Sequence, residues 1–75
     1  MDNTLKAEAM AGLYRAAHAM LVEAAKDVQA ASEAAINGEL NLGRGSAMGA
    51  ETLLDSINRL MTAAAAIHGL NTPTR

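Results

Sequence analysis

The hydrophobic positions between residues 4 and 36 follow the period of an α-helix. No proline interrupts this segment, and its one glycine is Gly12. At 100° per residue, the apolar side chains fall in one arc of the helix and the charged ones in the opposite arc. The apolar arc contains Met10, Leu13, Tyr14, Ala17, Met20, Leu21, Ala24, Val28, Ala31 and Ala35. The pattern predicts one long amphipathic helix over residues 4–36.

A second helix is predicted over residues 46–68. Its apolar residues are separated alternately by three and four positions, which is the heptad pattern of helices that pack along their length. The repeat comprises Ala50, Leu53, Ile57, Leu60, Ala64 and Ile67, with Leu54, Met61 and His68 recurring every seventh residue beside it. Ser46 is a favourable N-cap and Gly69 a favourable stop.

Residues 37–45 are predicted to form the loop between the two helices. The pair Asn37-Gly38 favours a helix end, because glycine readily adopts the left-handed conformation. Two further glycines follow before residue 46, which favours a loop. Leu40 and Leu42 within it either close the end of the helical pair or form an exposed apolar tip. Residues 69–75 are predicted to be a polar tail.

The two helices predict an all-α fold, a two-helix antiparallel hairpin. The apolar seam of the first helix is assigned to Met10, Leu13, Ala17, Leu21, Ala24, Val28, Ala31 and Ala35. Two consecutive four-residue steps in this seam predict a stutter that locally relaxes the supercoil. The core of the hairpin, or of a dimer of hairpins, is predicted to contain Ala17, Leu21, Ala24, Val28, Leu53, Ile57, Leu60, Met61, Ala64 and Ile67.

The predicted helices differ in length, about 50 Å against roughly 33 Å at 1.5 Å per residue. Folded back, the second helix would cover the first only from about Tyr14 onward, leaving Leu5, Met10 and Leu13 on an overhang. One hairpin also leaves each apolar stripe half covered, which a small domain tolerates poorly. We therefore expect a homodimer that forms a four-helix bundle. A hairpin docked on a different protein and a self-sufficient monomer are the alternatives.

Composition narrows the classes of partner. The 75 residues contain no cysteine, which rules out disulfides and thiolate metal sites. The net charge of −2 and the single aromatic residue, Tyr14, disfavour nucleic-acid binding, which typically uses basic patches and stacking rings. No run of ~18 apolar residues suits a membrane span, and no secretory signal pattern opens the chain. We expect a cytoplasmic protein without membrane contact.

Residues with chemical potential are scattered along the two helices. His18 and His68 lack the Glu-x-x-His spacing of metal-binding bundles. The carboxylate pairs Glu23/Asp27 and Glu51/Asp55 are expected on solvated arcs. The segment Gly43–Ser46 leads into the predicted helix and includes Arg44, so an anion site is one candidate there. It matches no phosphate-loop pattern, and the favoured interpretation is a flexible loop. We expect no enzyme activity, no metal and no cofactor.

The favoured function is that of a non-enzymatic helical protein acting through protein–protein contact, as an adaptor, chaperone or inhibitor. Its candidate partner-binding residues are Leu5, Met10, Leu13, Leu40, Leu42 and Arg44. An RNA-binding hairpin dimer is the runner-up, although Lys6, Arg15 and Lys26 are mixed with acidic residues rather than gathered into a basic surface. A pure oligomerisation element is the third possibility.

Overall fold

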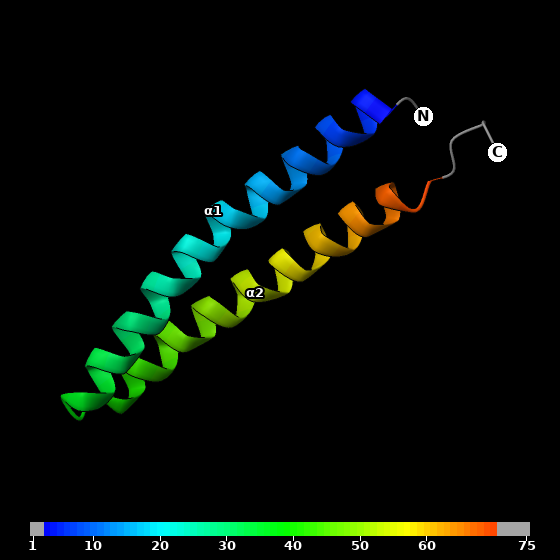
Figure 1. The fold of residues 1–75 in the computed structure, drawn as a ribbon. Helices are drawn as coiled ribbons and strands as arrows, with labels where there is room; N and C mark the ends of the chain where they lie inside the picture. The colour runs from blue at the N-terminus through cyan, green and yellow to red at the C-terminus, as the bar shows by residue number, and fades with distance from the viewer. Residues whose placement is uncertain (1–2, 71–75) are drawn as a thin grey trace.

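The computed structural model describes residues 3–70, which form two antiparallel helices joined by a tight turn. Helix α1 spans Asn3–Ile36 and helix α2 spans Leu40–His68 (Figure 1). The helices pack against each other along their length, and residues 3–70 contain no strand. The predicted all-α hairpin is confirmed. Residues 71–75 of the predicted tail lie outside the described residues.

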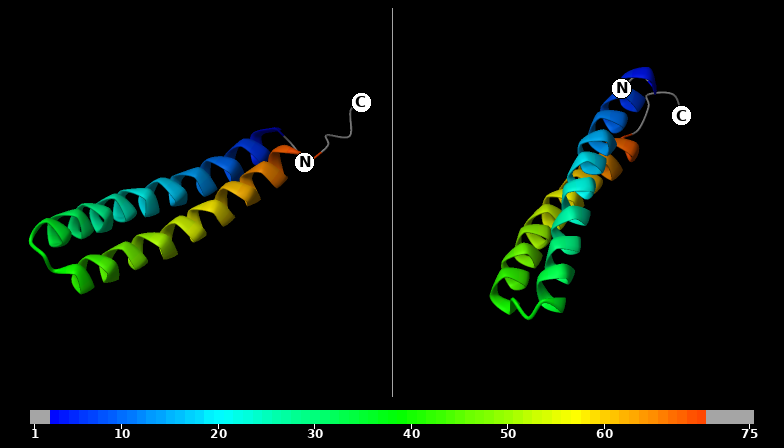
Figure 2. Two further views of the ribbon diagram at one scale, coloured as in Figure 1. Left: turned by 90° about the horizontal axis from the view of Figure 1, so that it is seen from below. Right: turned by 90° about the vertical axis from the view of Figure 1, so that its left-hand side faces the viewer.

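The two helices wind about each other instead of lying flat. Their ribbons overlap near the turn and spread toward the termini in Figure 1, whereas the left view of Figure 2 shows the wider separation at the turn. The molecule measures 60 × 14 × 11 Å along its principal axes. Winding of this kind is what a seven-residue apolar repeat imposes on packed helices. Neither helix contains a stretch apolar enough to cross a lipid bilayer.

Gly38 ends α1 in the predicted left-handed conformation, with φ of +79°. The backbone N–H of Gly38 donates to the carbonyl oxygen of Ala35 at 3.0 Å, and that of Glu39 donates to Ala34 at 2.8 Å. These two bonds satisfy carbonyl groups that the end of a helix otherwise leaves open. The chain therefore reverses within three residues.

The prediction of a loop over residues 40–45 is wrong, because α2 begins at Leu40 and not at Ser46. The glycines in this segment suggested a loop, since each costs a helix roughly 1 kcal/mol relative to alanine. Gly43, however, is buried against α1. A Cβ atom there would lie 3.2 Å from the Ala31 carbonyl oxygen and 3.6 Å from the Ala34 Cβ. The glycine permits close helix packing, and Ser46 lies inside α2, half-buried, where it caps nothing.

The longer α2 removes most of the predicted overhang. Three pairs fix the register: Lys6 with Leu70, Asp27 with Gly49 and Ala34 with Gly43, and in each pair the residue numbers add to 76 or 77. The first is a hydrogen bond of 3.1 Å from the Lys6 ammonium to the Leu70 carbonyl oxygen.

In this register His68 lies level with Glu8 and not with Tyr14. Met10 and Leu13 are half-buried within the hairpin, so only Leu5 of the three predicted overhang residues remains beyond α2. The prediction that Met10 and Leu13 project past the second helix is wrong, because the turn is shorter than the sequence suggested.

The seam of α1 also differs from the prediction. Met20 and Asp27 are half-buried and Ala34 is buried, whereas Leu21, Val28 and Ala35 are exposed. With these positions the spacing alternates between three and four throughout, so the predicted stutter is absent. Leu21 and Val28 were predicted in the seam because they are more apolar than Asp27. Which positions face inward is instead set by the pairing with α2.

The buried hydrophobic residues of the hairpin are all alanines: Ala17, Ala24, Ala34, Ala50 and Ala64. Among the predicted core residues, Leu53, Ile57, Leu60 and Ile67 are half-buried on α2. Leu21, Val28 and Met61 are about half exposed. No large side chain among residues 3–70 is fully buried, so the hairpin by itself encloses very little apolar volume.

Candidate interaction surface

One side of the hairpin carries a row of mostly apolar side chains from each helix, without Lys, Arg, Asp or Glu. On α1 the row follows the seam at seven-residue intervals, and α2 has the same arrangement on the same side of the pair. We call this surface the apolar flank. It consists of Ala7, Tyr14, Leu21, Val28 and Ala35 from α1, and Leu40, Ala47, Leu54, Met61 and His68 from α2. Antiparallel heptad helices place equivalent flanking positions of this kind side by side.

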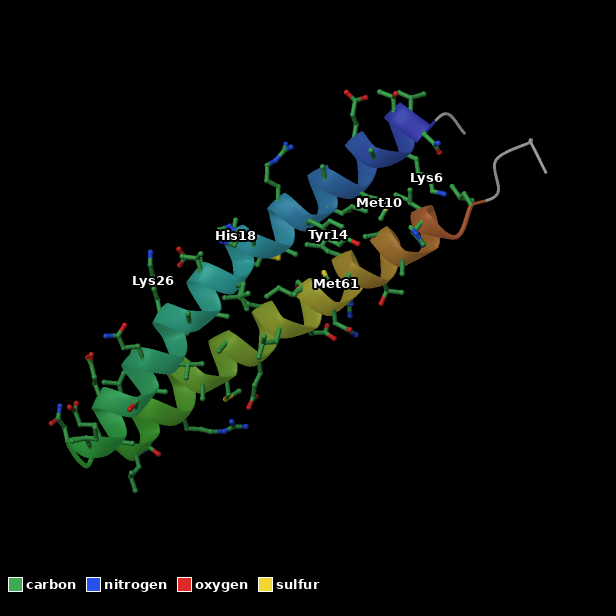
Figure 3. The ribbon with its side chains drawn as sticks, in the orientation of Figure 1. Lys6, Met10, Tyr14, His18, Lys26 and Met61 are labelled. Carbon is green, nitrogen blue, oxygen red and sulfur yellow. The ribbon has the colours of Figure 1, made fainter. Side chains whose placement is uncertain are left out.

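The large side chains of the apolar flank are only partly covered within the hairpin. Tyr14, Leu21, Val28, Leu54 and Met61 are each between 44% and 53% exposed. The register places Tyr14 level with Met61 and Leu21 level with Leu54. Figure 3 shows the side chains of Tyr14 and Met61 pointing toward each other from the two helices, while Lys26 points away from α2. The half-exposed side chains therefore form one surface.

Charge is excluded from this surface. The chain has 6 Lys+Arg and 8 Asp+Glu residues, yet none of them occupies a position of the apolar flank. The next positions outward on α1 are also uncharged: Thr4, Ala11, His18, Ala25 and Ser32. A solvated helix face normally carries charged residues, and these positions of the hairpin carry none.

The opposite side of the seam is shallow and more polar. Its positions are Ala9, Ala16, Glu23 and Ala30 on α1, and Leu42, Gly49, Ser56 and Ala63 on α2. Asp27 borders this side, and its Oδ2 lies 3.0 Å from where a Cβ of Gly49 would stand. We expected Asp27 on a solvated arc, but it is half-buried where the helices meet.

The predicted partner-binding residues do not form one site. Leu5 lies at the terminal end of α1, whereas Leu40 and Leu42 lie at the turn, 69% and 59% exposed. Met10 and Leu13 are half-buried between the helices. Ile36, which the sequence reading did not single out, is 80% exposed beside Leu40 at the turn. The described structure thus separates these residues into two ends of a long rod.

Arg44 lies within α2, one residue after the buried Gly43, and not at a helix N-terminus. Its guanidinium forms an ion pair of 2.9 Å with Glu51 one heptad further along the same helix. An anion site at residues 43–46 would need free N–H groups, but these groups are engaged within α2. The interpretation of this segment as a flexible loop is wrong, because the segment is helical.

Two further ion pairs lie on the surface of the described residues. Lys26 pairs with Glu23 at 3.3 Å, and Arg59 pairs with Asp55 at 3.0 Å as the i,i+4 spacing predicts. His18 and His68 are both exposed and lie on different helices. Within residues 3–70, no group of three or more His, Asp or Glu side chains has the geometry to hold a metal, and no pocket opens.

Tyr14 and Leu54 are the functional candidates that the choice of partner-binding residues missed. Both recur at seven-residue spacing with residues already recognised as apolar, and that spacing is the signal that could have grouped them. Pairing the two rows required the register, which only the folded hairpin supplies.

The chain matches no protein-family model, no curated protein and no solved structure. Its function is therefore inferred from its own surface.

Proposed function

We propose that this protein is a non-enzymatic helical hairpin that acts through protein–protein contact and associates with itself through the apolar flank to form a four-helix bundle. The observation that carries the proposal is the absence of charge from a surface that holds five half-exposed large side chains. Such contiguous apolar surface on a small soluble chain is characteristic of an interface.

The hairpin itself supplies the reason for association. Its buried hydrophobic residues are all alanines. A side chain of that size contributes little compared with the ~1.5–3 kcal/mol of a fully buried Leu, Val or Met. Chains of this size commonly rely on oligomerisation, metals or disulfides for stability. The sequence has no cysteine and therefore no disulfide. Covering the apolar flank would bury the large side chains that the hairpin leaves about half exposed.

The dimensions of the flank suit a second copy. The 29 residues of α2 extend along roughly 44 Å at 1.5 Å per residue, and two adjacent helices are about 20 Å wide. The resulting area of roughly 900 Å² is close to the ~800 Å² per partner of a stable interface. Contact with a different protein would then fall to the turn, where Ile36, Leu40 and Leu42 are exposed. RNA binding is less favoured, because the surface cations alternate with carboxylates and several are paired with them.

Sedimentation equilibrium at micromolar concentration tests the self-association. We expect twice the 7.7 kDa chain mass. Leu21→Ala removes about three methylene equivalents from each copy. Because Leu21 is already half-buried within the hairpin, about half of this loss affects the dimer interface. At ~0.8 kcal/mol per methylene, the dimer loses about 2 kcal/mol and its dissociation constant rises roughly 30-fold.

Leu5→Ala is the matched control, because Leu5 is similarly exposed but lies on the far side of α1. It should leave the dissociation constant unchanged. A folded species that remains at the mass of one chain throughout the concentration range would contradict the proposed dimer, and RNA capture by the folded protein would favour the runner-up.

A further inference from the structure

We propose that two copies pack apolar flank against apolar flank in opposite directions, so that the two turns lie at opposite ends of the bundle. This inference rests on the proposed dimer and specifies which side chains meet within it. It follows from the order of side-chain sizes along the flank and from the position of its middle.

The apolar flank is divided into levels by the register of the two helices. Going from the termini toward the turn, Tyr14 lies level with Met61, Leu21 with Leu54, and Val28 with Ala47. Of these three inner levels of the flank, the one nearest the termini is large and the one nearest the turn is small. We call the level of Leu21 and Leu54 the leucine level. It lies near the middle of Asn3–Ile36 and coincides with the middle of Leu40–His68.

A two-fold axis through the leucine level, perpendicular to the helices, pairs large levels with small ones. Tyr14 then packs against Val28 of the second copy, and Met61 against its Ala47, while Leu21 and Leu54 each meet their own counterpart. Each of the three inner layers of the interface then contains a comparable side-chain volume. Dense interiors need such complementarity, because large side chains must interdigitate with small ones.

The alternative axis runs along the hairpin and places both turns at the same end. The level of Tyr14 and Met61 would then face itself, and the level of Val28 and Ala47 would face itself. One layer is overfilled and another is left with a gap, and both faults destabilise an interface. The size pattern therefore favours opposite directions.

The edges of the flank agree with this arrangement. In opposite directions, α1 lies against α1 of the second copy, so its uncharged outer row of Thr4, Ala11, His18, Ala25 and Ser32 meets an equally uncharged row. The charged edge belongs to α2, where Arg44 and Glu51 are already paired with each other at 2.9 Å. No unpaired charge is buried.

The distance between spin labels at the two turns tests the direction. The chain has no cysteine, so Asn37→Cys gives one label per copy at an exposed position outside both helices. Position 37 lies 16 residues along the chain from Leu21, or about 24 Å at 1.5 Å per residue. In the proposed dimer the two labels lie on opposite sides of the leucine level, so they are about 50 Å apart. With both turns at one end, the separation is on the order of 20 Å, about two helix diameters.

A second labelled variant provides the matched control. Glu8 is exposed near the opposite end of α1, and Glu8→Cys places the label there. Mixed dimers of the two labelled chains should show a short distance between positions 8 and 37, because the proposed axis places Glu8 of one copy close to the turn of the other. A dimer with both turns together gives the reverse, a long mixed distance and a short distance between the two turns.

Exchanging side-chain sizes offers an independent readout. Val28→Tyr places two rings in one layer and should weaken association about tenfold or more, whereas adding Tyr14→Val should restore it. With both turns at one end, position 28 faces a small layer that can accept the ring, and no rescue is needed.

A long turn-to-turn distance with rescue by the double variant supports the proposed direction. A dimer with a short turn-to-turn distance overturns the direction but leaves the proposed self-association intact. A monomer by sedimentation overturns both.

Discussion

Two glycines in α2, Gly43 and Gly45, provide a sharp test of how the helices meet near the turn. Both lie in the segment that the sequence predicts as a loop, and both are inside α2 in the structure. A Cβ at position 45 would meet nothing within 4 Å, whereas one at position 43 would lie 3.2 Å from the Ala31 carbonyl oxygen. The two sites therefore share helix propensity but differ in packing.

Gly45→Ala should stabilise the protein by about 1 kcal/mol, because alanine is the better helix former and no neighbour is disturbed. Gly43→Ala gains the same helix propensity, but its Cβ would lie 3.2 Å from the Ala31 carbonyl oxygen. Because helix backbone cannot easily move, this close contact costs about 1–3 kcal/mol. The net effect at position 43 lies between neutral and roughly 2 kcal/mol destabilising. The two variants should thus differ by about 1–3 kcal/mol.

Urea and thermal denaturation followed by circular dichroism measure this difference, at one fixed chain concentration so that association affects all variants alike. A stabilisation of 1 kcal/mol corresponds to roughly 4–8 °C in Tm for a chain of this size. Gly12→Ala is a further control, because it lies within α1 with nothing within 4 Å, and it should also stabilise by about 1 kcal/mol.

Two results would refute the reasoning. Equal stabilisation by Gly43→Ala and Gly45→Ala would show that α1 does not approach α2 at the turn. Destabilisation by Gly45→Ala would show that residue 45 is not helical, in agreement with the loop that the sequence predicts.

The remaining predictions concern the seam and the surface. Asp27→Ala should stabilise the protein by roughly 0.5 kcal/mol in urea denaturation, because it removes a half-buried carboxylate from between the helices and improves helix propensity. Asp55→Ala is the control: it gains the same helix propensity but loses an exposed ion pair with Arg59, so its unfolding free energy should rise less. Arg44→Gln should change the unfolding free energy by less than about 0.5 kcal/mol, since both partners of its ion pair are about 60% exposed. Met61→Ala should weaken dimerisation in sedimentation equilibrium, whereas Met48→Ala, similarly exposed on the outer surface of α2, should not; equal effects would contradict the assignment of the apolar flank.

The agreement between sequence and structure is closest where a signal is local. Gly38 ends α1 as predicted, because an Asn-Gly pair needs no tertiary partner to favour a left-handed turn. The seam of α2 from Ala50 to Ile67 follows from its own unbroken heptad, and its residues are buried or half-buried as expected. Asp55 and Arg59 pair because they share one helix.

The disagreements arise where one helix decides the environment of the other. Gly43 resembles a loop residue in the sequence, but its missing side chain is required by the backbone of α1. Asp27 resembles a surface residue and Leu21 a core residue, yet the pairing of the helices reverses their exposure. The candidate surface had the same difficulty. The row of Leu54, Met61 and His68 on α2 was evident from its seven-residue spacing. Leu21 and Val28, however, were predicted in the seam of α1, and only the register places both rows on one side.

Residue spacing along the chain is enough to predict two amphipathic helices and the glycine that ends the first. These properties depend on residues a few positions apart, whose spacing is set by the helix itself. The tertiary structure alone decided where α2 begins, which residues face inward, and that the two rows lie on the same side. Those outcomes depend on contacts between residues up to 64 positions apart, and the free energy of such contacts is defined only once the chain has turned back on itself.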